Sequence, residues 1–212
     1  MLAKLTIFLP LIGFLFSGIL SRIIPSKNHH GLSDKFAQYF TTALMFVSAL
    51  CATLVFVEFY KTKQILNDTL FSFIKSGSFV ANWSIQIDAL SSVMFIVVTY
   101  ISFLVHLYSI GYMHDDRSIA RFMSYLSLFT FFMLALVSAD NFVQLFFGWE
   151  GVGVASYLLI GFWFKKDSAN RASMKAFIAN RVGDLGLILA IALTYLTFDS
   201  VEYSKVFYQL CN

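Results

Sequence analysis

Residues 141–164 read N-F-V-Q-L-F-F-G-W-E-G-V-G-V-A-S-Y-L-L-I-G-F-W-F, an apolar stretch with one acidic residue, Glu150, near its middle. About 20 such residues form a helix that can cross a bilayer, because each residue adds about 1.5 Å. A carboxylate at mid-depth costs roughly 2.5–3.5 kcal/mol on insertion scales, and intramembrane acids mark ion or proton paths. Small residues around Glu150 favour close helix packing over exposure to lipid. The alternative is an acid that only pairs with an arginine to lock helices together.

The composition is that of an integral membrane protein. Of 212 residues, 58% are hydrophobic and only 13% are charged, whereas a soluble domain has roughly 25% charged residues. The net charge is +3, and the basic residues lie between apolar runs rather than in one cluster, so we expect no nucleic-acid partner. Two isolated cysteines, Cys51 and Cys211, predict neither a disulfide framework nor a metal site. We therefore expect no redox centre on this chain.

Apolar segments predict an all-α polytopic membrane protein with about six transmembrane helices, at residues 5–24, 36–60, 89–111, 119–139, 141–164 and 172–198. We expect residues 1–198 to form the helix bundle and residues 199–212 to be a truncated, amphipathic tail outside the membrane. A signal peptide is the rival interpretation of the first segment, given Lys4 before it. The apolar run is longer than a signal-peptide core, however, and no A-x-A-like cleavage site follows it.

The pattern between the second and third apolar segments is that of a strand. Residues 79–88 alternate between apolar and polar types, apart from Val80. An apolar run at residues 71–74 and a Ser-Gly pair precede them, which predicts a short extramembrane β-hairpin between helices 2 and 3. An interfacial amphipathic element is the alternative. Asp88 is expected to cap the third helix, because its carboxylate can accept hydrogen bonds from the free amides of the first turn.

Three histidines are candidate site residues. His29 and His30 are adjacent, but no further metal ligand lies nearby, so we expect a solvated loop at residues 25–35. His106 lies about 25 Å along the third predicted helix, near its far interface. A hydrogen-bonded structural role and a proton relay both stay open for His106, with the structural role favoured.

Basic residues predict the orientation in the membrane. Lys and Arg, among them Lys27 and Arg117, are more numerous in the first, third and fifth connections than on the opposite side. Short cytoplasmic loops carry the excess of basic residues. We therefore expect the N-terminus and the hairpin to face outside, and the loop at residues 165–171 to face the cytoplasm or matrix.

Residues 174–187 read M-K-A-F-I-A-N-R-V-G-D-L-G-L and place Lys175, Arg181 and Asp184 within an apolar helix. Arg181 and Asp184 are three residues apart, so they share one face and can pair. At 1.5 Å per residue, Asp184 and Glu150 lie about 18 and 20 Å from the inner surface, which is the same level. Because the two helices are consecutive and antiparallel, we expect Glu150 to approach the face that carries Arg181. A carboxylate beside a movable cation can alternately hold and release a proton.

Four motifs in this order resemble one protein family: I-D-A-L-S-S-V-M (87–94), H-L-Y-S-I-G-Y-M (106–113), F-G-W-E-G-V-G-V-A-S-Y-L-L-I-G-F-W (147–163) and K-A-F-I-A-N-R-V-G-D (175–184). They are similar to the antiporter-like subunit L of respiratory complex I, NADH:quinone oxidoreductase, called chain 5 in mitochondria. Related subunits occur in multisubunit Na⁺/H⁺ antiporters and membrane-bound hydrogenases. The segment G-W-E-G-V-G is more similar to complex I.

The resemblance implies a proton-translocating membrane subunit that couples NADH oxidation and quinone reduction to proton pumping. The family's key glutamate falls on Glu150, and its sixth-helix motif falls on Lys175, Arg181 and Asp184, which implies that these four residues carry proton translocation. No cofactor is implied on this chain, while FMN, iron–sulfur clusters and quinone are implied on other subunits. The implied partners are the other membrane subunits of complex I, especially the neighbouring antiporter-like subunit, together with the lipid bilayer and protons.

The implied location is the bacterial cell inner membrane, as a multi-pass protein, with the mitochondrial inner membrane as the alternative. Family members are longer and continue with further helices, so this chain is expected to be an N-terminal fragment, one piece of a split gene or a truncated product. Two other functions stay open at this stage. One is a subunit of a multisubunit Na⁺/H⁺ antiporter, and the other is a structural remnant without transport.

Overall fold

The computed structural model describes residues 1–23, 32–77, 79–114, 116 and 118–211. The predictions for His29, His30, Lys27 and Arg117 lie outside these residues. Six of the described helices are long and apolar enough to cross a membrane, and a two-stranded sheet lies between the second and third of them. The predicted fold class is therefore confirmed.

The helices and strands have the following bounds: α1 Leu2–Ile23, α2 Leu32–Thr62, β1 Leu66–Ser76, β2 Phe79–Ile87, α3 Ala89–Tyr112, α4 Ile119–Val137, α5 Phe142–Ile160, α6 Asp167–Phe198 and α7 Tyr203–Cys211. They form two compact units. Unit 1 comprises Met1–Thr62 and Ser92–Leu134, and unit 2 comprises Lys63–Ser91 and Ala135–Asn212.

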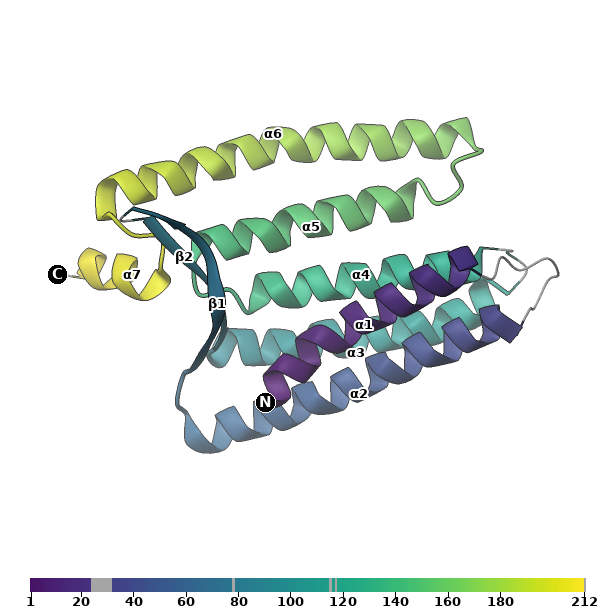
Figure 1. Cartoon of the computed structure of the whole chain (residues 1–212), viewed down its shortest axis with the longest axis horizontal. Coiled ribbons are helices and arrows are strands. Elements are labelled where there is room, and N and C mark those ends of the chain that lie inside the picture. The colour runs from purple at the N-terminus through teal and green to yellow at the C-terminus, as the bar shows by residue number, and fades with distance from the viewer. Residues whose placement is uncertain (24–31, 78, 115, 117, 212) are drawn as a thin grey trace. The chain divides into compact units, whose positions relative to one another are not determined.

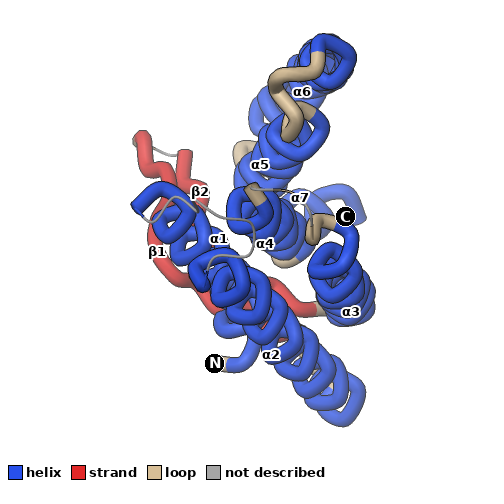
Figure 2. Tube along the Cα trace, turned by 90° about the vertical axis from the view of Figure 1, so that its right-hand side faces the viewer, coloured by secondary structure: helices blue, strands red, loops and turns tan. Residues whose placement is uncertain are grey.

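Unit 1 is held together by small and hydroxyl-bearing side chains. Helices α1 and α2 run side by side (Figures 1 and 2), and the Ser48 hydroxyl donates to the Thr6 carbonyl at 2.8 Å. The Ser17 hydroxyl of α1 donates to the Ala120 carbonyl of α4 at 2.7 Å. Lipid tails are as apolar as leucine, so transmembrane helices associate through close packing and hydrogen bonds of this kind rather than through the hydrophobic effect.

The hairpin of unit 2 has the predicted antiparallel strands, drawn red in Figure 2, and its pairing runs from Leu66↔Ile87 to Ser76↔Phe79. Strand β1 starts before the expected residues 71–74, because it pairs along the whole of β2 through two register shifts. Gly77 lies in the turn with φ +59°, a left-handed conformation that glycine adopts without a steric cost.

The helix that follows the hairpin is capped as predicted. The Ser91 amide donates to the Asp88 carboxylate at 2.8 Å, and the Asp88 amide donates to the Ser91 hydroxyl at 2.7 Å. The two residues thus form a reciprocal capping box, which satisfies two backbone amides at the start of α3.

The amide side chain of Gln144 fastens the hairpin to α5. It accepts from the Ser84 amide at 2.9 Å and donates to the Ser84 carbonyl at 2.8 Å, with Gln144 fully buried. Asn141 adds a second link, because it caps α5 by accepting from the Gln144 amide at 2.8 Å and donates to the Asn82 carbonyl at 2.7 Å. These bonds fix the N-terminal end of α5, which is the helix that carries Glu150.

Two helix bounds in unit 2 differ from the expected ones, and the tail contains a helix. Helix α5 ends at Ile160 rather than at 164. The Gly161 amide makes the last i→i−4 bond, to the Tyr157 carbonyl at 2.9 Å, and the next amide, of Phe162, bonds instead to the Leu159 carbonyl at 3.3 Å as the chain turns. Helix α6 begins at Asp167, before the expected residue 172. An acidic residue in the first turn suits the positive end of the helix dipole, which favours that earlier start. The tail residues Tyr203–Cys211 form a further short helix, α7.

A candidate proton site between two transmembrane helices

The site lies where α5 and α6 run side by side as an antiparallel pair (Figure 1). Glycine allows the closest contact in this region, because a Cβ atom on Gly148 would lie 2.6 Å from the Cα atom of Leu136. Any larger residue would push α5 away from that backbone. This contact fixes the position of the next two residues, Trp149 and Glu150.

Arg181 of α6 forms an ion pair with Glu150 of α5, with its Nη1 atom donating to Glu150 Oε1. The approach of Glu150 to the Arg181 face, expected from helix length alone, is therefore confirmed. Arg181 Nη1 also lies 3.7 Å from Asp184 Oδ2, which is an electrostatic contact but too long for a hydrogen bond. One guanidinium thus lies between two carboxylates.

The two carboxylates have different surroundings. The Asp184 side chain is 6% exposed and the Glu150 side chain is 26% exposed. Asp184 Oδ1 accepts a hydrogen bond of 2.9 Å from the indole Nε1 of Trp149. Sequence reasoning missed Trp149, although its position next to Glu150 and the need of an indole N–H for a partner were signals that could have found it.

Arg181 is also held by an aromatic ring. Its guanidinium carbon lies 4.6 Å from the centroid of Phe177, a cation–π contact. A small hollow beside the pair has room for about one water molecule. Its lining residues are Glu150, Gly153, Val154, Phe177, Asn180, Arg181 and Asp184. This hollow is large enough for a water molecule beside the ion pair.

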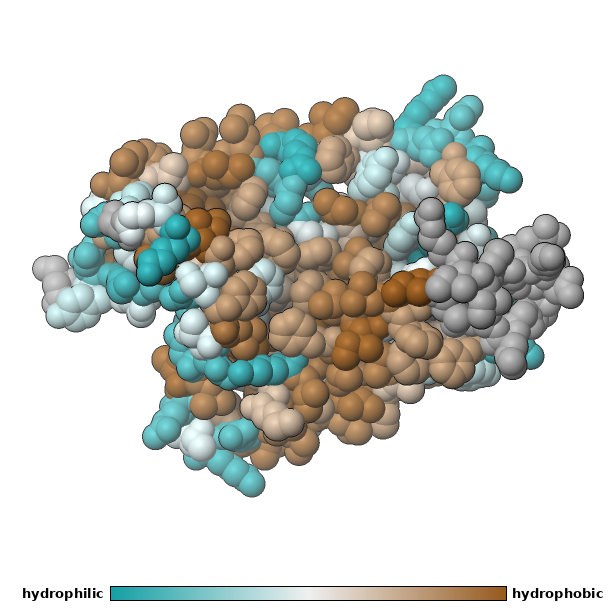
Figure 3. Space-filling model, in the orientation of Figure 1, coloured by the Kyte–Doolittle hydropathy of each residue, from teal (hydrophilic) through white to brown (hydrophobic). Residues whose placement is uncertain are grey.

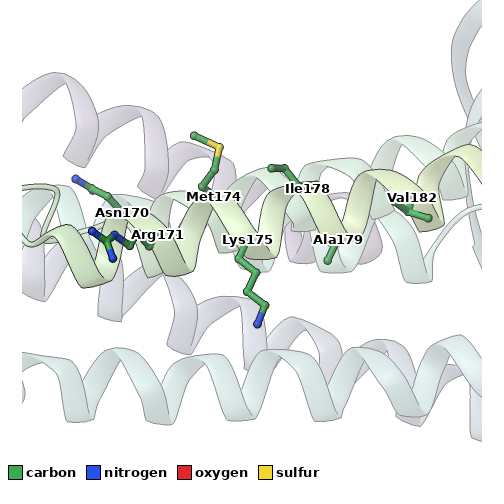
Figure 4. A pocket seen from close by; sticks show the side chains of 7 residues that line it. All are labelled: Asn170, Arg171, Met174, Lys175, Ile178, Ala179 and Val182. Atoms are coloured by element: carbon green, nitrogen blue, oxygen red, sulfur yellow. The ribbon is translucent and has the colours of Figure 1, made fainter.

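Lys175 does not join this cluster. It lies in a shallow hollow along one face of α6, where Met174 and Ile178 point to one side and Lys175 to the other (Figure 4). Among the residues that the structure describes, Lys175 forms no ion pair. Figure 3 shows hydrophobic side chains over much of α6, with a hydrophilic patch part-way along it. Of the four predicted site residues, the structure brings together Glu150, Arg181 and Asp184.

His106 has hydrogen-bond partners of its own in unit 1. The ring is fully buried, with Nδ1 2.8 Å from the Ser102 carbonyl and Nε2 3.1 Å from the Ser127 hydroxyl. A carbonyl only accepts, so Nδ1 carries a proton, and in the neutral ring Nε2 accepts from the Ser127 hydroxyl. This arrangement supports the structural role over the relay. Within the described part of the chain, no three His, Cys, Asp or Glu residues are grouped so that they could hold a metal ion.

Two family models match the chain. The model described as NADH-ubiquinone oxidoreductase (complex I), chain 5 N-terminus, matches residues 73–123. The model described as NADH:quinone oxidoreductase/Mrp antiporter, TM, matches residues 139–210, which include the whole Glu150–Arg181–Asp184 cluster.

Curated relatives match over nearly the whole chain. The NADH-quinone oxidoreductase subunit L of Rickettsia felis is 49% identical over 206 residues, which is 97% of this chain and 31% of that protein. The NADH-ubiquinone oxidoreductase chain 5 of Chondrus crispus is 47% identical over 203 residues, which is 96% of this chain and 29% of that protein. The chain thus spans less than a third of the length of these relatives.

Two solved structures share the fold. An archaeal membrane-bound sulfane sulfur reductase, a respiratory membrane complex, has a chain that superimposes with a TM-score of 0.78 at 20% identity, over 96% of this chain and 39% of its own. A chain of the Mrp complex from Dietzia sp. DQ12-45-1b gives a TM-score of 0.75 at 19% identity, over 97% of this chain and 21% of its own. Together with the motifs and the curated relatives, these matches show that the chain resembles, over nearly its whole length, the N-terminal part of the antiporter-like subunit L, or chain 5, of complex I.

Proposed function

We propose that this chain is part of a proton-translocating membrane subunit of NADH:quinone oxidoreductase, in which Glu150 carries the proton. The observation that carries the proposal is the ion pair between Glu150 on α5 and Arg181 on α6, with Asp184 beside it. Structural ion pairs alone do not need a second carboxylate within reach of the same cation. A cation with two alternative partners can release one of them to bind a proton.

The charges of the cluster favour the uptake of one proton. With all three side chains ionised, two carboxylates surround one guanidinium, and the cluster carries one net negative charge. Uncompensated charge away from water is costly, whereas protonation of Glu150 leaves Arg181 and Asp184 as a neutral pair. Arginine stays charged throughout, so the proton moves on the carboxylates. Proton uptake at Glu150 is then coupled to a shift of Arg181 toward Asp184.

The relatives' names supply the setting of this proposal. The energy would come from NADH oxidation and quinone reduction on other subunits, which would hold the FMN, the iron–sulfur clusters and the quinone. The partners would be the other membrane subunits of the complex, especially the neighbouring antiporter-like subunit. Lys175, one turn from the inner end of the predicted span, would pass protons between the inner surface and the cluster. We assign the chain to a bacterial inner membrane, with the mitochondrial inner membrane as the alternative, because the relatives include both kinds.

The test is Glu150→Gln in the native membrane complex, measured as NADH-driven acidification of membrane vesicles. We expect proton pumping and coupled NADH oxidation to fall sharply, because the amide keeps the shape of the side chain and cannot ionise. Glu58→Gln is the matched control, since Glu58 is exposed near the end of α2. Normal assembly with unchanged pumping in Glu150→Gln would overturn the proton-carrier role.

A second candidate function is a subunit of a Na⁺/H⁺ antiporter. The observation that favours it is the second family model, whose description includes the Mrp antiporter. Proton flux that depends on Na⁺ and needs no NADH would support this function. Copurification of the chain with flavin and iron–sulfur subunits would support complex I instead. A chain that assembles but can lose Glu150 without any effect on transport would be a structural remnant.

A further inference from the structure

Asp184 divides its two oxygen atoms between two neighbours. Oδ1 accepts from the Trp149 indole at 2.9 Å, while Oδ2 lies 3.7 Å from Arg181 Nη1. Arg181 donates instead to Glu150. The hydrogen bond from arginine thus goes to one carboxylate, and the hydrogen bond from tryptophan goes to the other.

Burial and sequence spacing alone would favour a hydrogen bond from Arg181 to Asp184 rather than to Glu150. Asp184 lies on the same helix as Arg181 at a spacing that favours pairing, and its side chain is 6% exposed against 26% for Glu150. Attraction between opposite charges is stronger where water is excluded. Asp184 would therefore be expected to hold the guanidinium more tightly than Glu150 does. A further interaction must satisfy Asp184 and leave Arg181 to Glu150.

The Trp149 indole has the properties that this interaction requires. An indole N–H donates one hydrogen bond and carries neither a charge nor an acceptor. It can stabilise the Asp184 carboxylate without neutralising it and without competing for Arg181. Trp149 is also the direct neighbour of Glu150 in α5, so the bond to Asp184 links the two helices at the level of the ion pair.

We propose that Trp149 is a positioning residue that sets how Arg181 is shared between Glu150 and Asp184. The role in transport rests on the proposed function, whereas the effect on the ion pair does not. Without the indole N–H, Asp184 Oδ1 loses its donor, and Asp184 compensates by binding the guanidinium, so that Arg181 moves from Glu150 toward Asp184. The hydrogen bond carries this role rather than the bulk of the ring, because Trp149 is 50% exposed and much of its ring lies outside the packed interior.

The first test examines the ion pair directly. The chain in lipid nanodiscs, labelled with ¹⁵N-arginine, ¹³C-glutamate and ¹³C-aspartate, would be studied by solid-state NMR for dipolar contacts of Arg181 with Glu150 and with Asp184. Trp149→Phe keeps a ring and loses the N–H, and Trp163→Phe in the turn after α5 is the control. We expect the ratio of Glu150-paired to Asp184-paired Arg181 to fall roughly tenfold in Trp149→Phe, as for loss of one hydrogen bond to a charged group. An unchanged Arg181–Glu150 contact in Trp149→Phe would overturn the proposal.

The second test uses the native complex and NADH-driven pumping across a range of pH. If Trp149 acts through Asp184, Trp149→Phe shifts the pH profile in the wild-type background and has no further effect in Asp184→Asn, which lacks the competing charge. A purely structural role predicts that the two substitutions have additive effects and leave the pH profile in place, and that result would overturn the proposal. Glu150→Gln distinguishes failure of the proposed function from failure of the proposed role of Trp149. If it leaves pumping intact, the proposed function fails, and the NMR contact still decides the role of Trp149.

Discussion

Gly148→Ala tests whether the close approach of α5 to Leu136 holds Glu150 against Arg181. The added Cβ atom would lie 2.6 Å from Leu136 Cα, while carbon atoms in favourable contact are about 3.5–4.0 Å apart. The obstacle is backbone rather than the end of a flexible side chain, so α5 must move by about 1 Å to restore normal contact. Glu150 lies two residues further along the same helix and would move with it.

The expected cost follows from two opposing effects. Overpacking of this kind lowers the free energy of unfolding by about 1–3 kcal/mol, whereas replacing glycine by alanine inside a helix raises it by up to about 1 kcal/mol. We therefore expect a net destabilisation of about 1–2 kcal/mol. If the proposed function holds, we also expect NADH-driven pumping to fall at least roughly tenfold, because a displacement of about 1 Å is enough to misalign interacting groups.

The assay measures thermal unfolding of the purified chain and pumping by the native complex. Gly183→Ala is the matched control, because no atom lies within 4 Å of the position of its added Cβ on α6. We expect this control to be neutral or slightly stabilising. A Gly148→Ala variant with the same unfolding temperature and the same pumping as the control would refute the inference that this contact positions Glu150.

Three further predictions follow from the remaining structure. Gln144→Leu leaves the buried amide and carbonyl of Ser84 without their side-chain partners. We expect a loss of about 2–5 kcal/mol of stability and faster hydrogen exchange at the Ser84 amide, and unchanged exchange there would contradict this. Burial, and to a smaller extent the nearby charge of Asp140, raises the pKa of the Tyr203 hydroxyl above its ordinary value of about 10. The neutral phenol therefore contributes stability that is fully present below about pH 10 and is lost as the pH rises further. Tyr203→Phe should remove this alkaline loss, as measured by unfolding between about pH 9 and 12. Membrane-impermeant labelling should reach a cysteine placed in residues 165–171 only from inside and one near Lys75 only from outside, and the opposite pattern would reverse the topology.

Some features of the site are set by local sequence alone. The six spans follow from hydropathy, the hairpin from its alternation, and the Asp88 cap from the residue type at a helix start. The common level of Glu150 and Asp184, and hence the approach of Glu150 to Arg181, follows from a fixed rise per residue along two consecutive antiparallel helices. These features depend on neighbours within a few turns, so the sequence determines them without knowledge of the rest of the chain.

Other features depend on which side chains meet, and only the tertiary structure decided them. Hydropathy measures how favourably a residue enters lipid and does not depend on the path of the backbone. It therefore predicts a helix through the apolar residues 161–164, although α5 ends at Ile160. The spacing of Arg181 and Asp184 predicted their ion pair, which is present at 3.7 Å. It did not predict that the hydrogen bond of Arg181 goes to Glu150 while Asp184 accepts one from Trp149. The hydrogen bonds are decided by competition between Arg181 and Trp149 for Asp184, and between Glu150 and Asp184 for Arg181. These residues lie on two helices, so residue spacing along one helix cannot predict which bonds form.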